Sequence, residues 1–233
     1  VPQIEIAVSD TATAFVFRHL LPFSARDLNA LTAFADTHYI QVWLQPAGPE
    51  TAALHHPQDG SGLAYTLPEF DVKMDFRPTD FTQVNVHINR VLVRRALQLL
   101  DPRPGERIAD LFCGLGNFSL PIARRGAFMV GVEGSVTLVA RALANAESNG
   151  LAARCEFHAA DLFESTEDSL AALGPLDKVL IDPPREGAIA VVKAISAAQR
   201  PRRIVYVSCN PATLARDAAV LVHEKGYVLR GAG

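Results

Sequence analysis

Cysteine is scarce in this sequence, and no two cysteines stand close together. Only Cys113, Cys155 and Cys209 occur among 233 residues, and none belongs to a C-x-x-C pair. This spacing excludes a disulfide framework and argues against a cysteine-rich metal site. Any chemistry at a thiol is therefore the chemistry of a single cysteine.

Long apolar runs are also lacking. No stretch approaches the roughly 20 residues that a membrane-spanning helix requires. The N-terminal VPQIEIAVSD has neither the basic start nor the apolar stretch of a signal peptide. We therefore expect a cytoplasmic protein that makes no contact with membranes.

An excess of positive charge is missing as well, because 22 Lys and Arg residues face 25 Asp and Glu residues. The formal net charge of -3 gives the whole chain no general attraction to nucleic acid. A nucleic-acid substrate would require a local basic patch or an additional domain. The composition itself, 49% hydrophobic and 20% charged, is typical of a globular chain with one good core and a smaller second one.

The first third of the chain predicts a small α+β domain over residues 1–75. Apolar and polar residues alternate in IEIAVSD and TAFVFRHL, follow a helical period in SARDLNALTAFADTHY, and alternate again in IQVWLQP. Residues 46–62 are rich in proline, glycine and polar side chains, so we expect an exposed loop. His55 and His56 lie in it, and their spacing favours solvated residues over metal ligands.

Residues 76–233 follow a different rhythm, in which apolar runs of strand length alternate with amphipathic segments of helix length. This alternation predicts an α/β, Rossmann-like domain with a doubly wound, mostly parallel sheet. Strands are expected at 107–112, 127–132, 154–158, 177–182 and 203–208, and helices near 86–100, 117–125, 136–149, 187–199 and 211–225. The final GYVLRGAG begins like another strand, so we expect both ends of the sequence to be boundaries within a longer protein.

A glycine turn joins the first of these strands to its helix in RIADLFCGLGNFSLPIA. Gly114 and Gly116 follow Asp110 there, and glycines let the backbone approach a ligand closely. The next helix offers free amide donors to that ligand. A dinucleotide fingerprint would place a third glycine at 119, where Ser119 stands, so the sequence weakens an NAD interpretation.

Acidic residues follow the second and third strands. Glu133 stands where such sheets commonly bind ribose hydroxyls, and Asp161 is placed to accept from an adenine amine. Each feature alone is common in turns or at solvated strand ends. Their order along one edge predicts an adenosine ligand without a pyrophosphate, which S-adenosylmethionine fits.

The fourth strand ends in Asp182-Pro183-Pro184, a rigid turn that fixes the backbone beyond the carboxylate. Asp182 is thereby placed beside the expected methyl donor. In amino-methylating enzymes a related turn is followed by an aromatic residue that stacks on the target base. Arg185 follows here, which favours carbon over an exocyclic nitrogen as the methyl acceptor.

Methylation of a pyrimidine carbon requires a nucleophile, because C5 of uracil reacts poorly until a group adds to C6. A thiolate suits this task, and a helix N-terminus favours the ionised thiol. Cys209 ends the fifth strand immediately before Asn210-Pro211 opens a helix. Cys155, inside a strand, and Cys113, in the glycine turn, are expected to be packing residues.

Five motifs together resemble the RNA uracil-5-methyltransferases, most of all the bacterial type that acts on 23S rRNA. They are DFTQVN (80–85), DLFCGLGNFSLP (110–121), GVEG (131–134), DPPREG (182–187) and VSCNPATLARD (207–217). The resemblance implies methylation of uridine C5 in 23S rRNA by S-adenosylmethionine, through an adduct between Cys209 and uracil C6. It also implies that Gln83, Phe112, Asn117, Glu133, Asp161 and Asp182 line the cofactor site, with Asp182 near the uracil as well.

Three departures from the family pattern accompany this resemblance. No cysteines match those of the family's iron-sulfur cluster, so we predict a cluster only in the full-length family and none in this chain. The basic N-terminal RNA-binding barrel is also missing. The general base is expected in a Phe-Pro-x-Thr-x-His-x-Glu segment beyond Gly233, and Glu224, on an amphipathic helix, is no substitute.

Two alternatives remain open at this point. The RNA substrate could be a tRNA or another rRNA site, since these motifs do not encode the target nucleotide. Alternatively, the chain as given is a cofactor-binding or interaction scaffold that binds S-adenosylmethionine weakly and does not turn over. In either enzymatic interpretation we expect a monomer with RNA as its partner.

Overall fold

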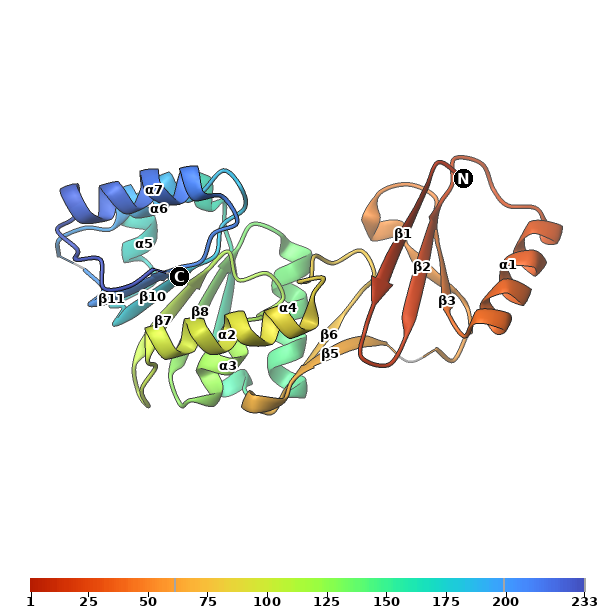
Figure 1. Ribbon diagram of the computed structural model, residues 1–233, viewed down its shortest axis with the longest axis horizontal. Helices are drawn as coiled ribbons and strands as arrows, with labels where there is room; N and C mark the ends of the chain where they lie inside the picture. The colour runs from red at the N-terminus through yellow and green to blue at the C-terminus, as the bar shows by residue number, and fades with distance from the viewer. Residues whose placement is uncertain (61, 199, 233) are drawn as a thin grey trace. The chain divides into compact units, whose positions relative to one another are not determined.

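The computed structural model describes residues 1–60, 62–198 and 200–232 (Figure 1). These residues form two compact units, Val1–Pro68 with Lys73–Val86, and Glu69–Val72 with His87–Gly233. The chain therefore passes between the units more than once around residues 69–86. We propose that the units are the two domains expected from the sequence.

The smaller unit is built on a four-stranded sheet in the order β1-β2-β3-β4. Its elements are β1 (Gln3–Val8), β2 (Thr13–Arg18), α1 (Ala25–His38), β3 (Gln41–Gln45), η1 (Pro49–Thr51) and β4 (Ala53–His56). Strands β2 and β3 run parallel and are joined by α1, whose first turn is closed by a capping box between Ser24 and Asp27. Phe17, Ala35 and Val42 form the buried core between helix and sheet.

The expectation of an exposed loop over 46–62 is wrong, because part of this segment is strand β4. His56 is only half-buried, and its Nε2 lies 2.6 Å from Asp36 Oδ1 on α1. His55 Nε2 lies 3.4 Å from Thr32 Oγ1 on the same helix. These partners are at least 20 residues away in sequence, so local spacing did not reveal them.

A two-stranded sheet, also absent from the expectations, follows the smaller unit's main sheet in the chain. It consists of β5 (Leu63–Leu67) and β6 (Val72–Phe76), joined through η2 (Pro68–Phe70). Leu63, Leu67 and Met74 are almost fully buried, so packing of these side chains holds a short hairpin that would be marginal alone.

The larger unit contains a five-stranded sheet in the order β11-β10-β7-β8-β9, and all four pairings are parallel. The strands are β7 (Arg107–Leu111), β8 (Phe128–Glu133), β9 (Cys155–Ala159), β10 (Lys178–Ile181) and β11 (Arg203–Tyr206). The helices are α2 (Val86–Leu100), α3 (Ser119–Arg124), α4 (Val136–Ser148), η3 (Ala152–Arg154), η4 (Leu162–Glu164), α5 (Glu167–Ala171), α6 (Ile189–Ala194), α7 (Pro211–Ala219) and η5 (Val220–Glu224). The predicted doubly wound parallel fold is confirmed.

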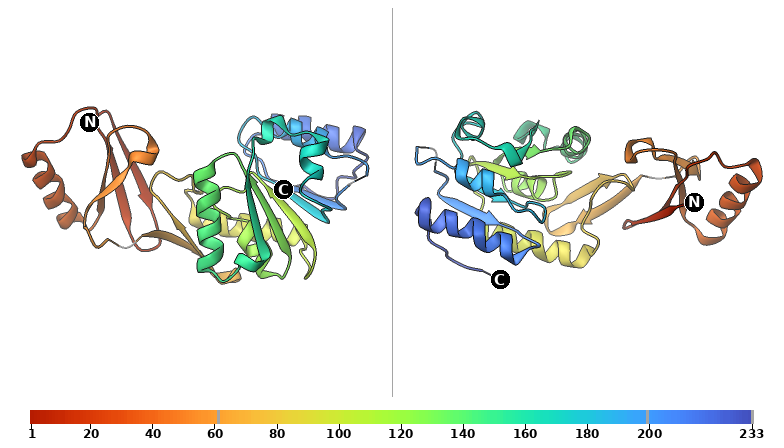
Figure 2. Two further views of the ribbon diagram at one scale, coloured as in Figure 1. Left: turned by 180° about the vertical axis from the view of Figure 1, so that it is seen from behind. Right: turned by 90° about the horizontal axis from the view of Figure 1, so that it is seen from above.

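Both faces of this sheet are buried, as a doubly wound fold requires. Figure 1 shows α5, α6 and α7 on one side of the sheet and α2 and α3 on the other, and Figure 2 gives the view from above. Ala109, Leu111, Val179 and Ile181 pack with α6 and η5 in one apolar cluster. Their neighbours Ile108 and Leu180 are equally buried, so apolar runs replace simple alternation in these strands.

Two helices and the C-terminal segment differ from expectation. Helix α6 ends at Ala194, earlier than predicted, and residue 199 lies outside the described residues. The last predicted helix is divided into α7 and η5, a single turn of π-helix. Residues 227–232 form no strand; instead the Tyr227 ring packs on the core and its hydroxyl donates to Pro201 O at 2.8 Å.

Within the described ranges, no helix is both long enough and apolar enough to cross a bilayer.

Candidate cofactor and nucleophile site

The sheet order reverses between β7 and β10, which lie side by side. The strand that follows β7 in the chain, β8, lies on one side of this pair, and the strand that follows β10, β11, lies on the other. Ligands of open α/β sheets bind in the crevice outside the carboxyl ends of the strands at such a reversal. Asp110 is the penultimate residue of β7, Glu133 is the last residue of β8, and Asp182 follows β10 directly. Three acidic residues therefore meet at one edge of the sheet.

The turn after β7 is built from backbone conformations that favour glycine. Gly114 and Gly116 have φ angles of 55° and 99°, and Phe112 adopts a φ of 65°. A non-glycine residue in this region carries strain that surrounding contacts must hold. Here Phe112 N donates to Val132 O at 2.9 Å, and a Cβ built on Gly114 would meet no atom within 4 Å. The space in front of the turn is open.

Glu133 ties the glycine turn to the start of α4. Its Oε2 accepts from Gly114 N at 3.0 Å, and its Oε1 accepts from Ser135 N at 3.0 Å. Each carboxylate oxygen retains lone pairs beyond these single bonds. The half-buried side chain thus both orders the turn and remains able to accept from a ligand.

Asp110 is the most unusual group at this edge, because it is fully buried. Its Oδ2 accepts from Ser119 Oγ at 2.6 Å, whereas its Oδ1 has no partner in the part of the chain that the structure describes. Burial, aided by the negative charges of Asp182 and Glu133, raises the pKa of Asp110 to about 7 against the bond from Ser119. A buried acceptor without a donor is costly, which points to a functional constraint.

The sequence interpretation missed the pairing of Asp110 with Ser119. The sequence shows Ser119 only as the residue that replaces a third glycine, yet its side chain is fully buried and holds the carboxyl group of Asp110. The sequence does contain a signal for this pairing, because a serine in place of glycine at the start of a helix indicates a side-chain hydrogen bond nearby.

Asn117 pairs with a helix rather than standing free. Asn117 and the buried Asn89 of α2 exchange two amide hydrogen bonds, each of 2.9 Å. This pair fastens α2 to the glycine turn. The expected contact of Asn117 with a cofactor stays a prediction.

Asp161 and Gln83 are placed differently from the three clustered acids. Asp161 is exposed, caps η4, and accepts from Phe163 N at 2.8 Å. That cap sets Phe163 beside Phe112, with ring centroids 5.6 Å apart. Gln83 belongs to the segment Lys73–Val86 of the smaller unit, so its contact with the cofactor also stays a prediction.

Asp182 is held by the backbone of the neighbouring strand. Its N–H donates to Leu111 O at 3.2 Å, which extends the pairing of β7 and β10 by one bond. Burial raises the pKa of its carboxyl group to about 6. The buried Pro183 follows and prevents the strand from continuing.

Cys209 is the exposed cysteine of the three, and it lies three residues beyond the end of β11. The turn around it is closed by Ser208 Oγ, which accepts from Asn210 N at 3.1 Å. Asn210 then caps α7 by accepting from Ala212 N at 3.1 Å, with Pro211 in the first turn. The thiol therefore stands just before a helix N-terminus, as the sequence predicts.

The other two cysteines are packing residues. Cys113 is buried, and a Cβ added to Gly131 would lie 2.9 Å from its Sγ. Burial and the charges of Asp110 and Glu133 raise the pKa of the Cys113 thiol well above its usual value. Burial raises the pKa of Cys155 to about 12. Burial therefore disfavours the thiolate form of both residues.

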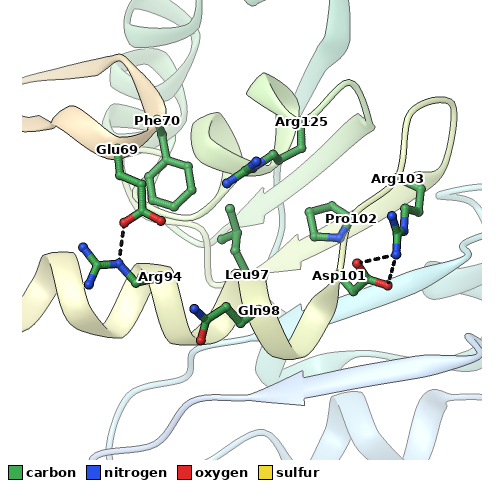
Figure 3. A pocket seen from close by; sticks show the side chains of 9 residues that line it. All are labelled: Glu69, Phe70, Arg94, Leu97, Gln98, Asp101, Pro102, Arg103 and Arg125. Atoms are coloured by element: carbon green, nitrogen blue, oxygen red, sulfur yellow. Dashed lines mark hydrogen bonds and ion pairs between the residues drawn. The ribbon is translucent and has the colours of Figure 1, made fainter.

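A cavity of about 240 Å³ lies elsewhere in the larger unit (Figure 3). Four of its five charged groups pair among themselves, Arg94 with Glu69 and Arg103 with Asp101 at 3.0 Å, and the fifth, Arg125, lies over the Phe70 ring. The loops after α2 and α3 that line it lead into the amino ends of β7 and β8, opposite the acids described above. Among the described residues, no group of three or more His, Cys, Asp or Glu side chains is arranged to hold a metal ion.

Residues 64–227 match the family model described as tRNA (Uracil-5-)-methyltransferase. Two relatives bear the name 23S rRNA (uracil(1939)-C(5))-methyltransferase RlmD. The protein from Azoarcus sp. (strain BH72) is 75% identical over 100% of this chain and 54% of its own length. The protein from Nitrosospira multiformis is 60% identical over 100% of this chain and 53% of its own length.

A solved structure supports the same relationship. The Pyrococcus abyssi tRNA (uracil-54, C5)-methyltransferase in complex with S-adenosyl-L-homocysteine superposes with a TM-score of 0.72 and 25% identity. The match covers 95% of this chain and 51% of that one, so the chain spans about half the length of the relatives it matches. Because the family model covers most of the sequence and the relatives are at least 60% identical over the whole chain, the chain belongs to the tRNA (Uracil-5-)-methyltransferase family.

Proposed function

We propose that the full-length protein containing this chain transfers a methyl group from S-adenosylmethionine to C5 of a uridine in 23S rRNA. One observation carries the proposal most directly: the exposed Cys209 follows β11 at the same sheet edge where Asp182 follows the adjacent strand β10. The names of the relatives support the reaction and its RNA. We further propose that the protein acts in the cytoplasm as a monomer.

The residues at the sheet edge fit S-adenosylmethionine by charge and by space. The cofactor carries positive charge on its sulfonium and ammonium groups, and Asp110 offers a buried oxygen to which no described residue donates. Asp182 and Glu133 add negative charge at the same edge. The open space before Gly114 leaves room for the ligand to approach the backbone.

The remaining predicted contacts have distinct proposed tasks. Phe112 and Phe163 form a tilted aromatic pair that offers an apolar wall to a flat base. Glu133 has lone pairs for the ribose hydroxyls, and Asp161 for the adenine amine. Asn117 and Gln83 complete the proposed set of cofactor contacts.

The proposed chemistry begins at Cys209. Its thiolate Sγ adds to C6 of the uracil, and the electron pair of the C5–C6 double bond moves toward C5 and the adjacent carbonyl. C5 then bonds to the electrophilic methyl group that the bound cofactor would supply, while the bond between that methyl group and the sulfonium breaks and S-adenosylhomocysteine is released. A base then takes the C5 proton, the C5–C6 double bond forms again, and Sγ leaves C6. Asp182 is placed to contact the cofactor and the uracil at once.

The base in this scheme is not Glu224. That residue is exposed on η5, 15 positions after Cys209. Helical rise over such a span carries it about 20 Å from the nucleophile. We propose that a residue outside the described ranges takes the C5 proton.

RNA that carries 5-fluorouridine tests the covalent step. Fluorine at C5 cannot leave as a proton, so the adduct persists after methyl transfer. The full-length protein should form a complex that survives denaturation, and peptide mapping should place the RNA on Cys209. A non-covalent complex only, or attachment to another residue, contradicts the proposed nucleophile.

A tRNA is the second candidate substrate, because the solved relative is named as a tRNA enzyme. Mass mapping of both RNAs from a deletion strain separates the candidates. We expect one 5-methyluridine to disappear from 23S rRNA while tRNA stays unchanged. The reverse pattern would establish the tRNA alternative.

The affinity for S-adenosylmethionine should rise with pH. Asp110 and Asp182, with pKa values raised to about 7 and about 6, must lose their protons to attract a cation. We expect affinity to increase about tenfold from pH 5.5 to 7.5, with protons released on binding. Calorimetric titrations in two buffers of different ionisation enthalpy measure both quantities. An affinity that is independent of pH would show that neither carboxyl group faces the cationic part of the ligand.

A further inference from the structure

The two loops that carry Asp182 and Cys209 leave the sheet side by side, but the strand ladder does not hold them beyond its last rung. Strands β10 and β11 pair as far as Ile181 with Tyr206, and Val207 N donates to Ile181 O at 2.8 Å. Past this bond another set of contacts must fix the distance between carboxylate and thiol.

That set consists of side chains from α7 that bind the backbone of loop 183–188. Asn210 Nδ2 donates to Arg185 O at 3.0 Å, and Arg216 Nη2 donates to Glu186 O at 2.9 Å. Thr213 Oγ1 also donates to Arg185 O, at 3.2 Å. One face of the helix that follows the nucleophile thus holds the loop that follows Asp182.

Asp217 is the centre of this arrangement and is fully buried. Its Oδ2 accepts from Ala188 N and from Tyr206 Oη, each at 2.6 Å, and its Oδ1 accepts from Arg216 Nε at 2.8 Å. Burial opposes ionisation, yet the bonds from Arg216, Tyr206 and Ala188 outweigh it and lower the pKa of Asp217. One carboxylate therefore connects β11, α7 and the start of α6.

Gly187 shows how closely the loop approaches the helix. Its φ is 78°, and a Cβ added there would lie 2.7 Å from both Arg216 Nη2 and Asp217 Oδ2. Only glycine fits this gap without moving the helix or the loop. The contact is therefore built into the backbone as well as into the side chains.

We propose that Asp217 is a positioning residue, which holds loop 183–188 against α7 and so fixes the Cys209 thiol relative to Asp182. This inference rests on the proposed function, because it assumes that Cys209 attacks the uracil while Asp182 contacts cofactor and base. Asp217 itself touches neither reacting group. A misplacement of about 1 Å between reacting groups costs about 10²-fold in rate.

Asp217→Asn in the full-length protein tests the proposal. The amide keeps the volume but can no longer accept all three bonds, because one oxygen becomes a donor nitrogen. We expect kcat for methylation to fall 10- to 100-fold, with an equal fall in the rate of adduct formation on 5-fluorouridine RNA. The Kd for S-adenosylmethionine should change less than threefold, because the glycine turn is untouched.

Glu106→Gln is the matched control. Glu106 is also a buried carboxylate with several partners, Lys178 at 2.9 Å and Arg103 N at 2.9 Å among them, but it stands at the amino edge of the sheet. The Glu106→Gln substitution should lower the unfolding temperature of the protein without changing kcat at 25 °C. An equal loss of kcat in both variants would show general destabilisation and overturn the proposal.

Thr213→Val keeps the test decisive if Asp217→Asn does not fold. It removes one bond to Arg185 O while preserving shape, and kcat should fall about threefold at unchanged cofactor affinity. Unchanged adduct rates in the folded variants would refute the positioning role. If the wild-type protein itself forms no adduct, the proposed function fails instead, so the two failures are distinguishable.

Discussion

Cys209→Ala should abolish methylation of the target uridine, with a fall in kcat of about 10⁴-fold or more, since removal of a covalent nucleophile has effects of this order. Cys209→Ser should be nearly as inactive, because a hydroxyl group is a far weaker nucleophile than a thiolate at neutral pH. Transfer of a labelled methyl group to RNA measures both variants.

Cys155→Ala is the control for this result. Cys155 is buried in β9, and its thiol pKa is raised to about 12, so it takes no part in the chemistry. Its replacement should leave kcat within about twofold and lower stability slightly. Retention of methylation by Cys209→Ala would eliminate the proposed mechanism, since Cys113 is too deeply buried to replace the lost thiol.

Asp110→Asn should change how the stability of the larger unit depends on pH. The pKa of Asp110 is raised to about 7 in the fold, compared with about 3.9 in an unfolded chain. The folded state therefore keeps a proton that the unfolded state releases, so the stability of the native protein falls as pH rises from about 4 to 7. The stability of the Asp110→Asn variant does not fall in this way, because the amide does not titrate.

The difference between the two proteins is large enough to measure. From pH 5 to pH 8, Asp110→Asn should gain about 2.5 kcal/mol in unfolding free energy relative to the native protein, at 1.36 kcal/mol per pKa unit. Hydrogen exchange of the β7 amides, corrected for intrinsic rates, reports this quantity locally. The same difference at both pH values would mean that Asp110 ionises normally in the fold.

This pH dependence also suggests why the fold contains a buried carboxyl group at Asp110 that lowers its stability. A charged carboxylate in a buried site without a full set of donors destabilises the apo protein. A cationic ligand would remove part of that cost on binding, so the same carboxylate that weakens the fold would strengthen cofactor binding. Stability and affinity are thus expected to change in opposite directions in Asp110→Asn.

Much of the candidate site was predictable because its information is local. A parallel α/β sheet places the ends of all its strands at one edge, so Glu133, Asp182 and Cys209 could be brought together from strand positions alone. Turn residues reinforced that inference: Gly114 and Gly116 adopt the positive φ angles that glycine favours. The capping position of Asn210 before Pro211 is likewise read directly from adjacent residues.

Other features depend on pairs far apart in the chain. His56 with Asp36, Asn117 with Asn89, and Ala188 with Asp217 are separated by 20, 28 and 29 residues. No periodicity marks such partners, because neither an isolated polar side chain nor a backbone N–H such as that of Ala188 indicates which distant residue it will bond. The mistaken loop at 46–62 has the same origin, since its strand exists through pairing with β3.

The sequence by itself determined the fold class, the order of the five parallel strands of the larger unit, and which residues stand near their ends, because hydrophobic period and turn chemistry are properties of neighbouring residues. Only the tertiary structure decided that Asp110 is buried with one oxygen to which none of the described residues donates, that Ser119 is its partner, and that Asp217 joins the loops of Asp182 and Cys209. Burial and long-range hydrogen bonds arise when the helices pack over the sheet. They set the charge and the position of the acidic and thiol side chains that the sequence identifies at the strand ends.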